Sequence, residues 1–190
     1  MILLFKKPLI IQQINWIIIS IITLLTPILA VAHESLMETY NQASNYGRYD
    51  KYLELDPSLP YDGDLVIPSG QNVYIDGRGA LIFGGESDIS VWVSDGSNLD
   101  IQQCIFVGGQ IAILFDSLVS GTINNNTIVG TSDAAIRAQL GFDNAETYIW
   151  SNIIVDCLFG IYCIDSIPAY VAFNDIYGID SLRYALYCPG

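Results

Sequence analysis

Aromatic residues that could stack on sugar rings are concentrated toward the C-terminal end of the chain. Tyr and Trp combine a large apolar ring with a polar atom, which suits a ligand that has C–H faces and hydroxyl groups. Trp150 follows Ile149, an apolar residue expected to point inward, so we expect Trp150 to point outward. Tyr148 is the second candidate. The alternative is that these rings pack in the interior or fill stacked columns: Tyr148, Trp150, Tyr162, Tyr170, Tyr177, Tyr184 and Tyr187.

Charged residues with catalytic or metal-binding potential are scattered. Arg137 follows the apolar Ile136 and is expected at an outward position, either as a ligand contact or as a solvated arginine. The aspartates do not share one position of the repeat described below, so no calcium ladder is predicted. The cysteines lack Cys-x-x-Cys spacing, which disfavours a zinc site. We therefore assign no catalytic residue, no metal ligand and no cofactor, and calcium is the one cofactor kept open.

The charge balance limits the partners that the chain can have. Seven Lys and Arg residues stand against 20 Asp and Glu residues, a formal net charge of −13. If Lys6 and Lys7 leave with the leader described next, five basic residues remain against 20 acidic ones, which gives −15. Nucleic acids and anionic membrane surfaces both bind cationic patches, so we expect neither as a partner.

The first 32 residues have the pattern of an export signal. Lys6 and Lys7 precede an apolar run over residues 14–29, and the run ends at Ala30-Val31-Ala32, a small-x-small cleavage pattern. The alternative is an uncleaved membrane anchor, because the run approaches the ~17–25 residues that span a bilayer. We expect a secreted or cell-surface protein that contacts membrane only through the leader, if the leader stays uncleaved.

A repeat of 22–26 residues runs through the rest of the chain. The segments "RGALIFG", "QCIFVG", "NNTIVG", "SNIIVD" and "FNDIYG" align on Gly79, Cys104, Asn126, Asn152 and Asn174. Two positions later the residues are Leu81, Phe106, Ile128, Ile154 and Ile176, and nine or ten positions later they are Ile113, Ile136, Ile161 and Tyr184. This period, without helical windows, predicts a β-solenoid in which stacked coils bury a shared core.

The asparagine column has an expected structural role. Apolar residues lie three positions before it and two positions after it, and one straight strand cannot place both on the same side. We therefore predict a bend at this column. An Asn side chain has one acceptor and two donors, so stacked asparagines can satisfy backbone groups of neighbouring coils. Cys104, Asn126, Asn152 and Asn174 are predicted to form this ladder, with Gly79 at its end.

The segments "NNTIVG", "SNIIVD", "GIYCIDS" and "FNDIYG" resemble those of the right-handed parallel β-helix proteins, the superfold of pectate lyases and polygalacturonases. The resemblance covers about residues 61–188. It implies an all-β, right-handed parallel β-helix, for which we expect about five coils and a short N-terminal helical cap.

The expected organisation has three segments. Residues 1–32 form the signal peptide, 33–60 the N-terminal cap and first strand, and 61–190 the coils. Leu36, Met37 and Tyr40 have helical spacing, so a short helix over 34–45 is predicted to cover the exposed end of the stack. The final "SLRYALYCPG" stops in mid-pattern, so we expect that the natural chain continues or that a partner completes the last coil.

The catalytic residues of the superfold do not map onto this chain. Pectate lyases place carboxylates that hold calcium beside an Arg, and polygalacturonase-like hydrolases use aspartates, a His and an Arg-x-Lys triplet. Here the only histidine is His33, and Arg-x-Lys does not occur. Our hypothesis is an exported, non-catalytic β-helix module that binds polysaccharide or serves as a surface or adhesion scaffold. The alternatives are a polysaccharide lyase or glycoside hydrolase, which rests on fold analogy alone, and a truncated remnant.

Overall fold

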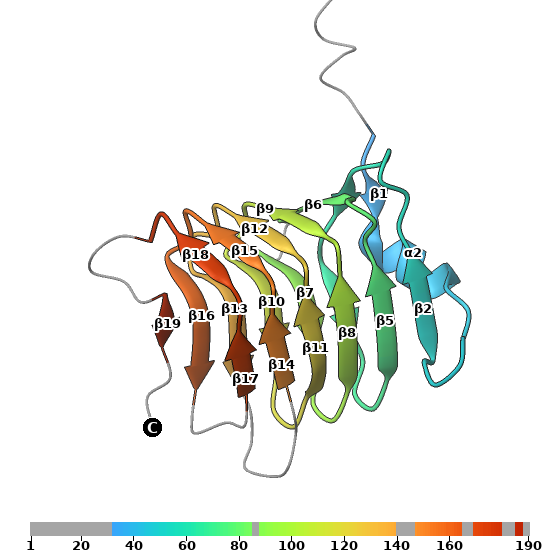
Figure 1. The fold of residues 1–190 in the computed structure, drawn as a ribbon. Helices are drawn as coiled ribbons and strands as arrows, with labels where there is room; N and C mark the ends of the chain where they lie inside the picture. Colours follow the sequence, from blue (N-terminus) through green and yellow to red (C-terminus); the bar gives the residue numbers. More distant parts are fainter. Residues whose placement is uncertain (1–31, 85–87, 140–146, 165–168, 180–184, 188–190) are drawn as a thin grey trace, which may run out of the picture. The chain divides into compact units, whose positions relative to one another are not determined.

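The computed structural model describes residues 32–84, 88–139, 147–164, 169–179 and 185–187. The predicted leader, apart from Ala32, lies outside these residues. From His33 onward the chain is a right-handed parallel β-solenoid (Figure 1). It has about six coils, one more than expected, because the strand at residues 51–54 begins a coil of its own. Among the described residues, no helix is long and apolar enough to cross a bilayer.

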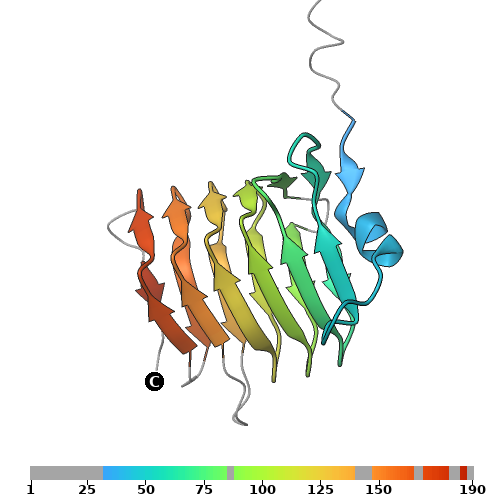
Figure 2. The ribbon, with the colours of Figure 1, turned by 45° about the vertical axis from the view of Figure 1, so that its right-hand side comes forward.

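Each coil contributes one strand to each of three parallel sheets (Figure 2). The first sheet contains β2 (Lys51–Glu54), β5 (Asn72–Asp76), β8 (Asn98–Gln102), β11 (Ser120–Asn124), β14 (Thr147–Trp150) and β17 (Ala169–Ala172). The second contains β1 (Glu34–Ser35), β3 (Tyr61–Asp62), β6 (Leu81–Phe83), β9 (Ile105–Val107), β12 (Thr127–Val129), β15 (Ile153–Val155) and β18 (Asp175–Tyr177). The third contains β4 (Leu65–Ile67), β7 (Ile89–Val93), β10 (Ile111–Phe115), β13 (Ala134–Gln139), β16 (Phe159–Ile164) and β19 (Leu186–Tyr187).

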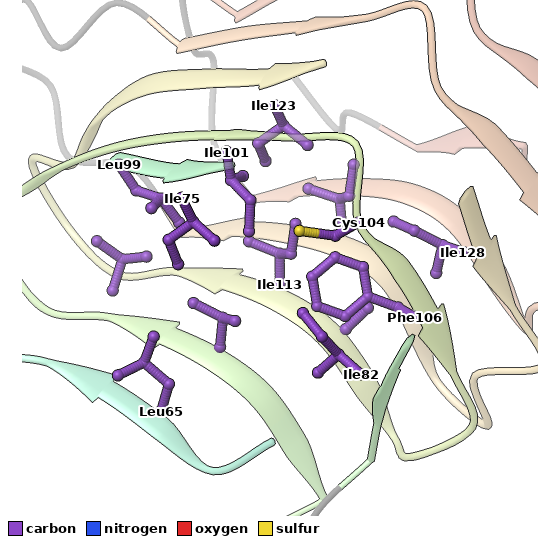
Figure 3. Close-up of a cluster of buried hydrophobic side chains, with 14 of the residues drawn as sticks. Leu65, Ile75, Ile82, Leu99, Ile101, Cys104, Phe106, Ile113, Ile123 and Ile128 are labelled. Atoms are coloured by element: carbon purple, nitrogen blue, oxygen red, sulfur yellow. The ribbon is translucent and has the colours of Figure 1, made fainter. Parts of the chain in front are cut away.

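The core consists of columns of like residues inside the coils (Figure 3). In the first sheet, Ile101 pairs with Ile75 on one side and with Ile123 on the other, and all three are buried. In the second sheet Phe106 lies in register between Ile82 and Ile128. Each fully buried aliphatic side chain contributes about 1.5–3 kcal/mol of burial free energy, so the stack is held mainly by these columns.

The predicted register is wrong at two places. Ile82, not Leu81, pairs with Phe106 and is buried. Ala80, not Gly79, therefore occupies the position equivalent to Cys104. The cause is the bend between β5 and β6, which is two residues longer than the later bends. In the third sheet, Ile161 pairs with Leu186, whereas Tyr184 lies outside the described residues.

The asparagine column forms a hydrogen-bonded ladder at the bend between the first and second sheets. The backbone N–H groups of Cys104, Asn126 and Asn152 each donate to the side-chain oxygen of the next Asn, at 2.9, 3.0 and 3.0 Å. The Asn152 side-chain NH₂ donates to the carbonyls of Ile123 and Trp150. Asn174 reaches the carbonyls of Ile149 and Ala172 in the same way. The ladder therefore ties the ends of β11, β14 and β17 together from inside.

The residue before each ladder position has a strained backbone conformation. Gln103, Asn125, Ser151 and Phe173 have φ between 54° and 56°, the left-handed region. This region costs a residue other than glycine roughly 1–2 kcal/mol. The ladder residue itself supplies the hydrogen bonds that hold the bend in place.

A short helix covers the N-terminal end of the stack, as the sequence predicts. Helix α2 (Leu36–Gln42) places Leu36 and Tyr40 in the core, and it contacts β2 and β4. Ser35 caps it by accepting a hydrogen bond from the backbone of Glu38 at 3.2 Å. The helix begins two residues later than expected, because residues 34–35 form β1 and pair with β3.

Candidate functional site

One row of outward side chains crosses all six strands of the first sheet. In register along the stack it contains Tyr52, Tyr74, Asp100, Thr122, Tyr148 and Tyr170. A neighbouring row contains Glu54, Asp76, Gln102, Asn124, Trp150 and Ala172. The two halves of this surface differ in what lies over them.

We call the outer side of β11, β14 and β17 the open face; it presents Thr122, Asn124, Tyr148, Trp150 and Tyr170. The Tyr148 and Tyr170 rings stack with centroids 5.0 Å apart and an interplanar angle of 8°. Trp150 is 45% exposed and Tyr170 60% exposed. The structure therefore brings together the two aromatic residues singled out in the sequence, Tyr148 and Trp150, and adds Tyr170 to them.

Phe173 extends the open face at the adjoining corner. It is 84% exposed and holds φ 56°, the strained position before the ladder residue Asn174. The conformation is the one shared by the residues before the other ladder positions, so the exposure of the Phe173 ring, and not its backbone strain, makes it a candidate contact. The sequence reasoning missed Phe173; its place directly before a ladder asparagine was the available signal.

We call the outer side of β2, β5 and β8 the covered face, because residues 44–50, the strap, lie over it. Asp100 accepts hydrogen bonds from Arg48 at 2.7 Å and from the Tyr49 hydroxyl at 2.8 Å. The Tyr49 ring packs against the Tyr74 ring, with centroids 5.2 Å apart. Tyr46 of the strap packs against Tyr52, which stacks on Tyr74 at 5.0 Å.

Burial changes the acidity of the covered tyrosines. It raises the pKa of Tyr49, and the hydrogen bond to Asp100 raises that pKa further, against an opposing effect of Arg48. Burial also raises the pKa values of Tyr52 and Tyr74, helped by nearby carboxylates. A general base needs a lowered phenol pKa, so these tyrosines are tuned away from proton abstraction.

A shallow hollow of about 330 Å³ lies at the corner between the first and second sheets. Its lining is mostly polar: Arg78, Gly79, Gln103, Cys104, Ile105, Asn125 and Thr127. Arg78 is held there by an ion pair with Glu54 at 2.7 Å. Amide and hydroxyl side chains such as these can donate to or accept from ligand hydroxyls.

Arg137, the third candidate from the sequence, lies apart from the open face. It belongs to β13 in the third sheet, where it forms an ion pair with Asp133 at 2.6 Å and lies over the Tyr162 ring. The structure therefore does not bring Arg137 together with Tyr148 and Trp150.

Side chains that could bind a metal are spread over the described residues. In the described part of the chain, no group of three or more His, Cys, Asp and Glu residues could hold a metal ion. His33 contacts Asp62 at 2.6 Å and stacks on Phe83. Cys104 and Cys157 are buried thiols, and burial raises the pKa of Cys104, which opposes thiolate formation.

No protein family, no curated protein and no solved structure matches the chain.

Proposed function

We propose that this protein is an exported, non-catalytic β-solenoid module that binds polysaccharide through its open face. The observation that carries the proposal is the stacked Tyr148–Tyr170 pair with the exposed Trp150 beside it on one sheet. Stacking limits the rotamer freedom of the rings, so less side-chain entropy is lost when a ligand binds. Export rests on the leader pattern, and the fold-level resemblance to pectate lyase-like proteins is consistent with a carbohydrate ligand.

The test is affinity electrophoresis of the purified protein through gels that contain neutral or acidic polysaccharides. Trp150→Ala is expected to weaken retention at least tenfold, because a central aromatic contact contributes about 1.4 kcal/mol or more. Its matched control is Trp92→Ala. Trp92 is 39% exposed and lies on the third sheet, so its loss is expected to leave retention unchanged.

A second matched pair tests the tyrosine. Tyr170→Ala removes a residue of the open face, whereas Tyr177→Ala removes a residue of similar exposure, 55%, from the second sheet. Equal loss in both variants, or no retention on any polysaccharide, would contradict the proposal. Release of shorter saccharides from any polymer would favour the lyase or hydrolase alternative instead.

A further inference from the structure

The open face is built from strands that contain no charged residue. β11, β14 and β17 have the sequences SGTIN, TYIW and AYVA. Their outward side chains offer aromatic rings, the Thr122 hydroxyl and the Asn124 amide. These groups match the C–H faces and hydroxyls of a sugar, and none carries the full charge that pairs with a carboxylate.

The cations of the described residues are already bound to other groups. Arg48 pairs with Asp100, Arg78 with Glu54 and Arg137 with Asp133. Lys51 donates to the carbonyls of Asn41 and Ala43 at 3.1 and 2.7 Å. Each of these cations already has a carboxylate or carbonyl partner, and none of them lies on β11, β14 or β17.

The charge of the whole chain acts in the same direction. A net charge of −13 repels a polyanion, over about 10 Å at 0.1 M salt. On the covered face, Glu54, Asp76 and Asp100 lie in the same two rows as the open-face residues. Asp100 is buried under the strap and, like Glu54 and Asp76, lies beside an arginine, so the repulsion of an acidic polymer comes mainly from the net charge of the chain.

We infer that the ligand of the open face is an uncharged polysaccharide, not a polyuronate. This inference rests on the proposed function and narrows it to one ligand class. Aromatic contacts with Trp150 and Tyr170 and hydrogen bonds to Thr122 and Asn124 supply the affinity. Binding is therefore insensitive to salt.

The experiment compares polymers that differ in charge. Retention is measured on a neutral glucan, a galactan and a xylan, and on polygalacturonate with and without methyl esterification. The esterified and free forms share one backbone, so they differ mainly in charge. Each polymer is tested at low and high salt, with calcium and with a chelator. Retention of at least one uncharged polymer, unchanged by salt and lost in Trp150→Ala, is the expected result.

Other outcomes separate the ligand class from the function itself. Retention of free polygalacturonate equal to or tighter than that of every uncharged polymer, and lost in Trp150→Ala, would overturn the ligand class and leave the proposed function standing. The same holds if that retention needs calcium. Absence of retention on every polymer would overturn both.

A gain-of-charge variant tests the electrostatic reason. Asn124 lies in register beside Trp150, so Asn124→Lys adds an unpaired cation to the open face. We expect at least about threefold tighter retention of free polygalacturonate at low salt, lost at high salt. Retention of the uncharged polymer should not increase, because Asn124→Lys also removes the Asn124 amide that contacts that polymer. Ser132→Lys adds the same charge at an exposed site between β12 and β13 and should give no gain. Equal gains in both variants, or none in Asn124→Lys, would overturn the charge argument.

Discussion

Two stacked tyrosine pairs occupy the same outward row of the first sheet, and they are put to different uses. Tyr52 and Tyr74 stack at 5.0 Å and 9°, and Tyr148 and Tyr170 at 5.0 Å and 8°. The strap buries part of the first pair, whereas the second pair is exposed. The same coil geometry therefore gives a structural cluster on the covered face, where Asp100 binds the strap, and an accessible surface on the open face.

The two halves are also supported from opposite sides. The covered face is held from outside, through the bonds of Arg48 and Tyr49 to Asp100. The open face is held from inside, through the asparagine ladder, which ends at Cys104. Because the ladder supports these strands from inside, the outer side chains of the open face are not needed to stabilise the fold and can contact a ligand.

Asn152→Ala is expected to have the largest effect. It removes the acceptor of the buried Asn126 N–H and the side-chain donor to the carbonyls of Ile123 and Trp150, so the free energy of unfolding should fall by about 2–4 kcal/mol. Polysaccharide affinity should fall as well, because the ladder fixes the end of the strand that carries Trp150. Denaturant unfolding and affinity electrophoresis measure the two effects.

The control for this variant is Asn124→Ala, one coil earlier and on the outer side of the sheet. Its free energy of unfolding should stay within about 0.5 kcal/mol of the parent protein. Equal destabilisation by both variants would show that the ladder is not the internal support of the open face.

Asp100→Ala should affect the covered face alone. It removes the acceptor shared by Arg48 and Tyr49, and we expect a loss of about 1–3 kcal/mol in the free energy of unfolding. Asp100→Asn keeps an acceptor and should lose less. Polysaccharide retention should be unchanged in both variants; a tenfold loss would mean that the two faces act as one site.

Alkaline pH should weaken the covered face by a smaller amount. The pKa values of Tyr49, Tyr52 and Tyr74 are raised, mainly by burial, so the folded state favours the neutral phenols. That stability is fully present below the unfolded pKa of about 10 and is lost as pH rises through the folded values.

The measurement is denaturant unfolding between about pH 9 and pH 11, where the unfolded tyrosines ionise. The free energy of unfolding should decline with pH in the parent protein. Tyr49→Phe removes one of the ionising groups and should give a shallower decline. An identical decline in the variant would mean that Tyr49 does not favour the neutral form in the folded state.

The fold could be predicted from the residue types that recur at the same position of each coil. Inward isoleucines and the ladder asparagines recur at 22–26 residues, so the solenoid, the bend and the outward direction of Trp150 follow from spacing. The register between β5 and β6 did not follow, because that bend has two extra residues and no ladder asparagine to mark its position.

The strap and the division of the first sheet into two faces could not be predicted. Tyr49 and Asp100 are 51 residues apart in sequence, and Tyr49 lies outside the repeat. Arg137 shows the same limit. Its outward position was predictable from Ile136, but its sheet and its ion pair with Asp133 depend on how the coils stack.

The tight bend before each ladder residue affects which side chains the edge of the first sheet can present. Gln103, Asn125, Ser151 and Phe173 share one backbone conformation while differing in size, polarity and aromaticity. The neighbouring asparagine secures the chain path, so the preceding side chain is free to vary. Each of these four coils thus carries one exchangeable position at the edge of the first sheet, where single substitutions could change ligand preference without altering the scaffold.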